Sequence, residues 1–387
     1  MNTVKSFALK AKELFKKEVM LSVSLLAAVI ALLITPPKIT LLADIDWKTL
    51  ATLFMMLTVL EGFKKENIFL PLIRFSSRLS TMTGISLFLV FGVFFTSMFV
   101  TNDVSLIIFV PLTILLFRSG KKEKYILPVI SMENIAAIRG SMLMPFGSPQ
   151  NLFLFSQSGV SVWKFILHML PLNVFSAVLL VGFICFLYRK DKNEKIVLSS
   201  ETTEGKWADE KKKNRIVYIC LFIMIILTIV TRTKFWYISA LIVLVAVILT
   251  DKALLKQTDY VLLLTFLCFF IFSSSIAGNP SISGFLKKSV AKHEYWWALG
   301  LSQIVSNVPA SIILYPFTTN LSGLLYGADT AGLCSIIGSL ASVINYRIYV
   351  REYPKNGTKF LKTFTLISWA FFIIVVIPGF FLSKWSF

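Results

Sequence analysis

Long apolar runs, separated by short polar segments, repeat along the whole chain. A run of about 20 apolar residues spans the hydrocarbon of a bilayer as a helix. Because a lone strand cannot satisfy its backbone groups in lipid, each run is predicted to be helical. The pattern predicts an all-α polytopic membrane protein with about nine to eleven transmembrane segments. One long hydrophilic stretch, 189–215, divides the chain into two halves and is predicted to be a cytoplasmic linker.

The two halves repeat one motif. The stretch VTNDVSLIIFVPLT at 100–113 matches VSNVPASIILYPFT at 305–318, which pairs Asn102 with Asn307. Each motif interrupts an apolar segment and predicts the tip of a re-entrant hairpin. An inverted repeat of this kind is typical of secondary transporters. The first repeat, 1–188, is predicted to contain helices 19–35 and 49–62, hairpin 84–117, broken helix 126–158 and helix 163–188; a connecting helix, 216–231, precedes the second repeat, 232–387, with helices 235–250 and 260–277, hairpin 295–326, broken helix 330–350 and helix 360–383.

Composition narrows the class of protein. The chain of 387 residues is 56% hydrophobic and 15% charged, whereas soluble domains carry about 25% charged residues, so a soluble enzyme is excluded. The net charge of +19 indicates basic cytoplasmic loops and not a nucleic-acid partner. If 84–117 is a hairpin, 29 Lys and Arg residues lie on one side of the membrane and nine on the other. This asymmetry predicts a cytoplasmic N-terminus and an external C-terminus.

The two predicted hairpin tips are polar. The first tip is Thr101-Asn102-Asp103, and its carboxylate is costly within a membrane unless it is protonated, paired or hydrated. It is interpreted either as a site for substrate or a transient H⁺ or Na⁺ near Asn102 and Asp103, or as a structural helix cap. The second tip, Ser306-Asn307, has no acid, and a plain capped turn is its alternative interpretation.

Two further segments predict breaks in membrane helices. The sequence RGSMLMPFGSPQN at 139–151 holds two Gly and two Pro, which cannot continue one regular helix, and GLCSIIGSLAS at 332–342 is its counterpart. Helix N-termini exposed at such breaks attract anions. A small anion is therefore the predicted substrate and a cation its partner, with no cofactor and no structural metal. The candidate site residues in the breaks are Gly140, Ser141, Gly147, Ser148, Pro149, Gln150, Asn151, Gly338 and Ser339.

Two charged residues lie close to the first break. Glu133 and Arg139 are interpreted either as a buried ion pair or, in the case of Arg139, as a direct contact to the anion. A guanidinium suits the geometry of carboxylates and oxyanions.

These motifs resemble a known group of proteins. The stretches TNDVSLIIFVPLTILL, GSMLMPFGSPQNLFLF, SNVPASIILYPFT and GSLAS are similar to those of the ion transporter superfamily, which includes arsenite permeases, NhaD-type antiporters, citrate transporters and divalent anion/sodium symporters. The resemblance is strongest to small bacterial arsenite-permease/citrate-transporter-like inner-membrane proteins. It implies a bacterial plasma membrane location, a scaffold with an elevator-like moving domain, and a homodimer. Asp103 matches the acid that follows Asn in arsenite-permease-like members.

The predicted function is secondary active transport of a small anion, an oxyanion or a carboxylate, coupled to H⁺ or Na⁺. A Na⁺/H⁺ antiporter without an anion substrate is the alternative within the same class. An intramembrane enzyme is the alternative from a different class. The sequence shows no paired acids at catalytic spacing, no nucleophile with a base and no metal-ligand cluster, so the protein is predicted not to be an enzyme.

Overall fold

The regular elements in the described part of the chain are all helices. The computed structural model describes residues 19–36, 41–66, 68, 79, 81–189 and 214–385. Five helices are long and apolar enough to cross a membrane: α6, α7, α10, α15, and α21 with its preceding turn, and α2, α12 and α13 are shorter apolar helices. The prediction of an all-α polytopic membrane protein is confirmed. The helices are α2 (Val19–Ile34), α3 (Leu41–Asp44), α4 (Trp47–Lys65), α6 (Met82–Val100), α7 (Asn102–Ser119), α8 (Ile126–Ser141), α9 (Pro149–Ser158), α10 (Val162–Leu187), α12 (Arg215–Val230), α13 (Trp236–Asp251), α14 (Leu254–Gln257), α15 (Tyr260–Ala277), α16 (Pro280–Val290), α17 (Glu294–Val305), α18 (Asn307–Leu314), α19 (Leu321–Ala331), α20 (Leu340–Glu352) and α21 (Gly357–Leu382), with short 3-10 turns at Glu123–Tyr125, Tyr315–Phe317 and Pro354–Asn356.

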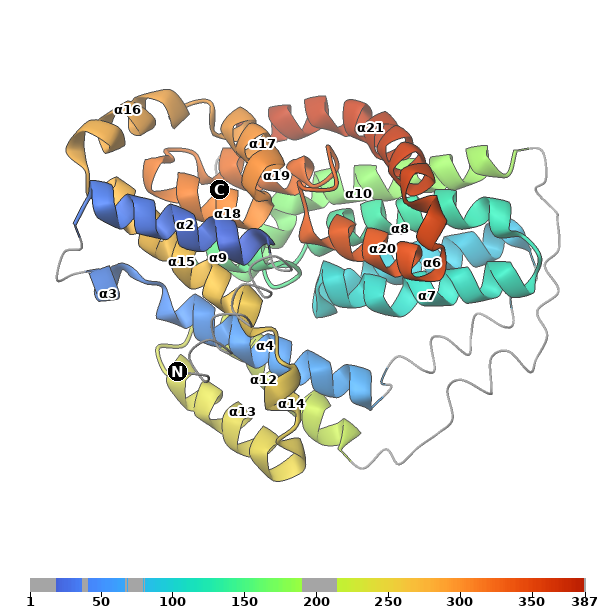
Figure 1. Cartoon of the computed structure of the whole chain (residues 1–387), viewed down its shortest axis with the longest axis horizontal. Coiled ribbons are helices and arrows are strands. Elements are labelled where there is room, and N and C mark those ends of the chain that lie inside the picture. Colours follow the sequence, from blue (N-terminus) through green and yellow to red (C-terminus); the bar gives the residue numbers. More distant parts are fainter. Residues whose placement is uncertain are drawn as a thin grey trace, which may run out of the picture.

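The helices form two groups (Figure 1). In the first, called the support group, α4 packs on α12 and α13, and α15 packs on α2. In the second, called the hairpin group, α6 and α7 pack on α8, and α17 packs on α18 and α19. The groups meet chiefly where α15 contacts α18 and where α4 contacts α9. Large apolar side chains, including Leu241 and Leu249 of α13, are 60% and 80% exposed, as expected of a surface that faces lipid.

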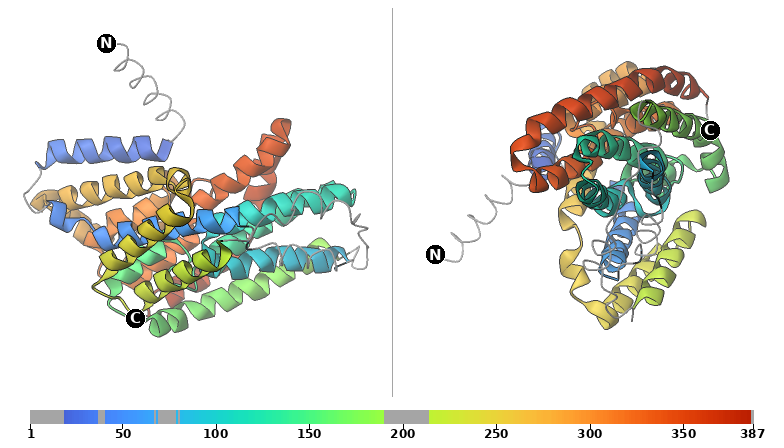
Figure 2. Two further views of the ribbon diagram at one scale, coloured as in Figure 1. Left: turned by 90° about the horizontal axis from the view of Figure 1, so that it is seen from below. Right: turned by 90° about the vertical axis from the view of Figure 1, so that its right-hand side faces the viewer.

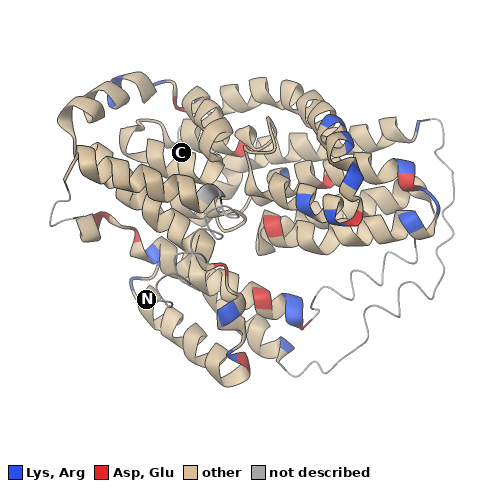
Figure 3. Ribbon diagram, in the orientation of Figure 1, with Lys and Arg blue, Asp and Glu red and all other residues tan. Residues whose placement is uncertain are grey.

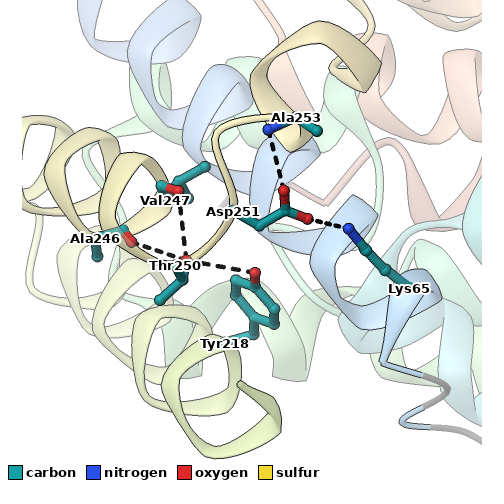
Figure 4. Close-up of polar contacts among 7 residues, drawn as sticks. All are labelled: Lys65, Tyr218, Ala246, Val247, Thr250, Asp251 and Ala253. Carbon is teal, nitrogen blue, oxygen red and sulfur yellow. Dashed lines mark hydrogen bonds and ion pairs between the residues drawn. The ribbon is translucent and has the colours of Figure 1, made fainter. Parts of the chain in front are cut away.

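Polar contacts hold three helices of the support group together at one end (Figure 4). The Asp251 carboxylate, at the end of α13, accepts hydrogen bonds from the ammonium of Lys65 on α4 and, at 3.1 Å, from the backbone N–H of Ala253. The hydroxyl of Tyr218 on α12 donates to Thr250 Oγ1 at 3.4 Å. These contacts fix the ends of α4, α12 and α13 relative to each other.

Matching local geometry marks the two repeats. Asp46 precedes α4 with φ −77° and ψ 78°, and Asp259 precedes α15 with φ −75° and ψ 82°. Each carboxylate accepts a hydrogen bond of 2.9 Å from the backbone N–H three residues on, at Thr49 and Leu262. Aspartate at this position satisfies an N–H that the helix itself leaves free.

The two hairpins have the same unusual tip. Thr101, between α6 and α7, has φ 74° and ψ 155°, and Ser306, between α17 and α18, has φ 71° and ψ 161°. Such a conformation is essentially restricted to glycine and costs about 1–3 kcal/mol in other residues. The hairpins enter the molecule from opposite ends of its long axis, and the views of Figure 2 agree with Figure 1 on this arrangement. An inverted pair of strained tips is the element of the fold that positions the candidate site.

Three features of the second repeat differ from the prediction. The second hairpin ends at Phe317, not at 326, and the broken helix begins at Leu321, not at 330. The reason is Asn320, whose side-chain oxygen accepts the Gly323 N–H at 3.1 Å and starts a new helix. Helix α16 was not predicted; Asn279 caps it and Pro280 occupies its first position. The predicted linker, 189–215, lies largely outside the described residues, and the N-terminal segment 1–18 lies entirely outside them.

Candidate functional site

The first hairpin tip is buried but has little internal bonding. Asn102 is 5% exposed, and its side-chain oxygen accepts the backbone N–H of Asp103 at 2.9 Å. The Asp103 carboxylate is half-buried, and its Oδ1 atom has no hydrogen-bond partner among the described residues. A buried carboxylate oxygen without a donor is unfavourable unless a proton or a cation satisfies it. The predicted Thr101-Asn102-Asp103 tip therefore presents an acid with free binding capacity.

The second hairpin tip is held against the second helix break. The backbone N–H of Asn307 donates to the carbonyl oxygen of Gly338 at 3.2 Å. One turn before the tip, Gln303 donates to the Ala331 carbonyl at 3.1 Å and accepts from the Ser335 hydroxyl at 2.7 Å. Ser306 and Asn307 are 6% and 2% exposed. Tip and break thus form one bonded unit in this repeat.

The two breaks have a common construction. The N-cap of α9, Ser148, has φ −146° and ψ 153°, and the N-cap of α20, Ser339, has φ −146° and ψ 138°. The glycine before each cap lies on the last carbonyl of the preceding helix. A Cβ atom would lie 2.2 Å from the Ser141 oxygen at Gly147 and 2.4 Å from the Ala331 oxygen at Gly338. No real Cβ tolerates such a distance, so only glycine allows the chain to fold back this tightly.

The caps themselves differ. The Ser148 hydroxyl accepts the Asn151 N–H at 3.4 Å, and Pro149 follows it at the first helical position. By contrast, Thr101, Ser306 and Ser339 make no side-chain cap bond to α7, α18 and α20. Of the four helices that begin at a hairpin tip or a break, only α9 has a bond from its N-cap side chain, and α7, α18 and α20 have none. Two of these termini are partly satisfied in other ways, since the Asn102 amide oxygen accepts the Asp103 N–H of α7 and the Gly338 carbonyl accepts the Asn307 N–H of α18. The N–H groups that stay open, with the positive end of the helix dipole, favour an anionic ligand.

The two broken helices meet through a buried cluster of charged and amide groups. The Arg139 guanidinium of α8 donates to the backbone oxygen of Asp329 on α19 at 2.9 Å, and both residues are at most 1% exposed. The Asp329 carboxylate accepts from Gln150 Nε2 at 3.1 Å, and the Asn151 amide, with its nitrogen facing Asp329, donates at 3.1 and 3.2 Å. Arg139 also places positive charge at the C-terminal end of α19, where the helix dipole is negative.

The predicted ion pair of Glu133 with Arg139 is not formed among the described residues. Glu133 Oε1 instead accepts a hydrogen bond from the Thr113 hydroxyl of α7, and its Oε2 has no partner. Glu133 and Arg139 are six residues apart, and because a helix has 3.6 residues per turn, their side chains lie on different faces of α8. Arg139 has Asp329 as its acidic neighbour, and Glu133 lies about two turns below the break, away from the other candidates.

The candidates fall into three sets. The first set is the first break, Arg139, Gly140, Ser141 and the segment Gly147 to Asn151, of which Arg139, Gln150 and Asn151 contact Asp329. The second set consists of Ser306, Asn307, Gly338 and Ser339. The first tip is the third set. The first two sets meet where Gly332 lies against Ser339 and Ile138. Helix α6, which ends at the first tip, packs on Gly140 of the first set. Within the described residues, no hydrogen bond joins Asn102 to Asn307.

Sequence reasoning missed Asp329. It is an acid within an apolar segment, two residues before the second break, as Arg139 is two residues before the first. That signal, a charge inside a membrane helix at a repeated position, could have identified it. Among the described residues, no group of three or more His, Cys, Asp and Glu side chains is arranged to hold a metal ion.

Comparison with known proteins places this architecture in a family. A family model described as citrate transporter (CitMHS) matches residues 14–338. The chain is similar to an uncharacterized transporter of Methanocaldococcus jannaschii (MJ0456), with 30% identity over 86% of this chain and 88% of that protein. It is also similar to the inner membrane protein YbiR of Escherichia coli K12, with 31% identity over 79% of this chain and 81% of that protein. With its helical membrane-spanning segments and inverted hairpins, the chain belongs to the citrate transporter family of membrane transporters.

Proposed function

We propose that the protein is a secondary active transporter for a small anion, an oxyanion or a carboxylate, coupled to H⁺ or Na⁺. The observation that carries the proposal is the set of three helix N-termini, of α7, α18 and α20, that begin without a side-chain cap. The N–H groups of these first turns that remain unbonded, together with the helix dipoles, favour negative charge, and the hydroxyls of Thr101, Ser306 and Ser339 would add neutral donors. The substrate would bind among these termini.

The coupling cation is assigned to the first tip. Asp103 is the charged residue of the two predicted tips, and its Oδ1 atom lacks a partner among the described residues. A proton or a Na⁺ bound there would remove the cost of an unpaired carboxylate within the membrane. The amide of Asn102 would complete the cation site.

The movement is proposed to be elevator-like. The support group would stay fixed, and the hairpin group would carry the substrate, because both tips and both breaks belong to the hairpin group. The end of the molecule that carries most of the described Lys and Arg side chains is proposed to face the cytoplasm (Figure 3).

The test is uptake of anions into proteoliposomes in which the purified protein is reconstituted. Radiolabelled citrate, sulfate and arsenite are offered separately, with and without an imposed pH or Na⁺ gradient. Gradient-dependent accumulation of one anion is expected. Uptake that ignores both gradients would refute the coupling, and absence of uptake for every anion would refute the substrate class.

A second candidate is a Na⁺/H⁺ antiporter without an anion substrate. It is favoured by the same unpaired carboxylate, since the two tips present an acid and no basic side chain. Counterflow of Na⁺ against H⁺ in liposomes without any added small anion would select this function.

A further inference from the structure

Two helices of the hairpin group, α7 and α8, meet α20 around a buried polar cluster. Helix α20, which begins at the second break, packs on both of them, and α7 packs on α8 (Figure 1). The polar side chains of this junction are Thr113 of α7, Glu133 and Asn134 of α8, and Ser342 and Asn345 of α20, and each is 0% exposed. None of them forms a hairpin tip or caps a break. The anion site proposed above leaves this cluster without a role.

Three acceptor oxygens of this cluster have no hydrogen-bond donor. The Thr113 hydroxyl donates to Glu133 Oε1. The Asn134 Nδ2 atom donates to Ser342 Oγ at 3.0 Å, and the Asn345 Nδ2 atom donates to a backbone oxygen of α8 at 2.7 Å. Glu133 Oε2, Asn134 Oδ1 and Asn345 Oδ1 are buried and have no partner among the described residues. Buried polar atoms without partners are rare in native proteins, so three in one junction indicate that a proton or a cation belongs there.

These groups gather around one turn of α8. Ile130, Glu133 and Asn134 stand at positions i, i+3 and i+4, which lie on one face of a helix. The Ile130 carbonyl oxygen is the atom that accepts from Asn345, so this amide lies beside the same face. Since a carbonyl oxygen can only accept, the Nδ2 atom of Asn345 points at Ile130 and its Oδ1 atom points away from it. The carboxyl group and the two amides therefore face one junction of α7, α8 and α20.

No positive charge balances Glu133 within the described part of the chain. It forms no ion pair there, its bonded neighbour is the neutral Thr113, and Arg139 of the same helix is directed to α19. Helix α6, which also packs on α8, has no charged residue. The charged residues and histidine of the other elements that pack on α8 are Asp103 and Arg118 of α7, Glu123 and Lys124 of the turn before α8, Lys164 and His168 of α10, Arg347, Arg351 and Glu352 of α20, and Lys359 and Lys362 of α21. All except Asp103 and His168 are exposed. Asp103 lies about three turns along α7 from the cluster, and the His168 ring is bonded to α19.

A proton on Glu133 supplies what the cluster lacks. An ionised carboxylate without a cation is costly within a membrane, and a water molecule would leave its charge uncompensated. Protonation removes the charge and also converts Oε2 from an acceptor without a donor into a donor. The Oδ1 atoms of Asn134 and Asn345 are acceptors that need such a donor. A proton also requires no additional space, which suits a junction whose polar atoms are all buried.

We propose that Glu133 binds a proton and is a second proton-coupling residue of the transporter, with the amide oxygens of Asn134 and Asn345 as acceptors for the protonated form. The binding of the proton is independent of Asp103, because it uses other residues. The coupling rests on the proposed function: since α7, α8 and the second break belong to the hairpin group, a proton on Glu133 would move with the substrate.

Binding of the proton is tested by infrared spectroscopy of the purified full-length protein in detergent at neutral pH. The signal is the carbonyl stretch of a protonated carboxyl group, taken from the difference between the wild type and Glu133→Gln. The wild type is expected to show this band and Glu133→Gln to lack it. In Asn134→Ala or Asn345→Ala the band should shift to higher frequency, because the carboxyl group loses a hydrogen-bond acceptor. These two variants keep the test decisive if Glu133→Gln does not fold on size exclusion.

The matched control is Glu123→Gln, which removes an exposed acid just before α8 and should leave the band unchanged. A wild type without the band, or a band that neither Glu133→Gln nor the two amide variants change, overturns the proposal.

Coupling is tested by anion uptake into proteoliposomes under a pH gradient. Glu133→Gln should reduce this uptake at least tenfold, because an amide cannot release a proton, and Glu123→Gln should retain wild-type uptake. Wild-type uptake in Glu133→Gln would refute the coupling role. If the wild type itself takes up no anion, the proposed function fails, and the infrared band still decides whether Glu133 binds a proton.

Discussion

The two repeats of this transporter share their backbone and differ in their side chains. Thr101 and Ser306 adopt the same positive-φ conformation, and Ser148 and Ser339 the same extended one. Yet the matching positions two residues before each break carry Arg139 and Asp329, which have opposite charges and contact each other. Because the two repeats share their backbone arrangement, equivalent positions of the two broken helices come together. Identical charges at these positions would repel each other, whereas Arg139 and Asp329 attract, which stabilises the contact between the two broken helices.

The two hairpin tips also share a backbone conformation but differ in their side-chain contacts. The second tip is bonded to its break through Asn307 and Gln303, and Glu294 fixes the end of its hairpin by accepting the backbone N–H groups of Thr319 and Asn320 at 2.9 and 3.0 Å. The first tip has longer arms and an acid with an unpaired oxygen. The second hairpin is thus held in place by hydrogen bonds, whereas the first hairpin carries the acidic side chain that can bind a proton or a cation.

The largest effect is expected at the buried charges. Arg139→Met leaves Asp329 without its neighbouring positive charge and should lower the free energy of unfolding by about 3–5 kcal/mol. Thermal unfolding in detergent, followed by tryptophan fluorescence, measures it. The double variant Arg139→Met/Asp329→Leu should recover most of the loss. Lys65→Met, which breaks the exposed pair with Asp251, is the control and should cost about 0–1 kcal/mol. Equal losses in Arg139→Met and Lys65→Met would show that the buried contact stabilises the protein no more than the exposed ion pair does.

The next effect concerns transport. Asp103→Asn should reduce gradient-driven anion uptake to the background level, because the amide can neither release a proton nor neutralise Na⁺. Val308→Asn places the same amide side chain at the matching position of the second tip and should leave coupling intact. Both proteins should elute as the wild type does on size exclusion. Wild-type coupling in Asp103→Asn would remove this residue from the mechanism.

A smaller effect tests the shared backbone. Thr101→Gly and Ser306→Gly relieve an unfavourable conformation and should each raise the free energy of unfolding by about 1 kcal/mol, after the entropy cost of glycine. Thr96→Gly, in the last two turns of α6, introduces glycine into a helix and also removes the hydrogen bond of the Thr96 hydroxyl to Ser105 Oγ at 3.0 Å, so it should lower the free energy of unfolding by at least about 1 kcal/mol. A difference in sign between Thr101→Gly and Ser306→Gly would contradict the equivalence of the tips.

The smallest effect separates the two caps. Ser148→Ala removes an observed cap bond and should cost about 1 kcal/mol. Ser339→Ala removes none and should change stability by less than about 0.5 kcal/mol. If Ser339 contacts the anion, its substitution should still raise the anion concentration needed for half-maximal uptake. Calorimetric unfolding and a concentration series of uptake measure the two quantities.

Much of this architecture was predictable because lipid imposes it. The broken helix at 126–158 and the helix at 260–277 have the predicted outer bounds, since apolar length and turn residues determine them. The amphipathic helix α16 was not predicted because it is short, and its start signal, Asn279-Pro280, was not used. Asn320 was missed as a cap although its neighbours Thr318, Thr319, Ser322 and Gly323 are typical of a turn, because the predicted hairpin was extended across them to 326.

The site was harder to predict than the fold. Sequence spacing could pair Asn102 with Asn307, because the repeats align there without gaps. It could not reveal that Arg139 faces Asp329, since this contact depends on how two breaks cross in space. The roles of the candidate residues in binding stay predictions until the variants above are measured.

Gly140 has a consequence for how this protein can change shape. A Cβ atom there would lie 2.0 Å from the Phe94 carbonyl oxygen of α6, so the backbones of α6 and α8 touch without side chains between them. Two rods in such contact cannot slide or rotate independently without collision. The depth of the first tip is therefore locked to the first break, and any motion that exposes one to water must carry the other with it.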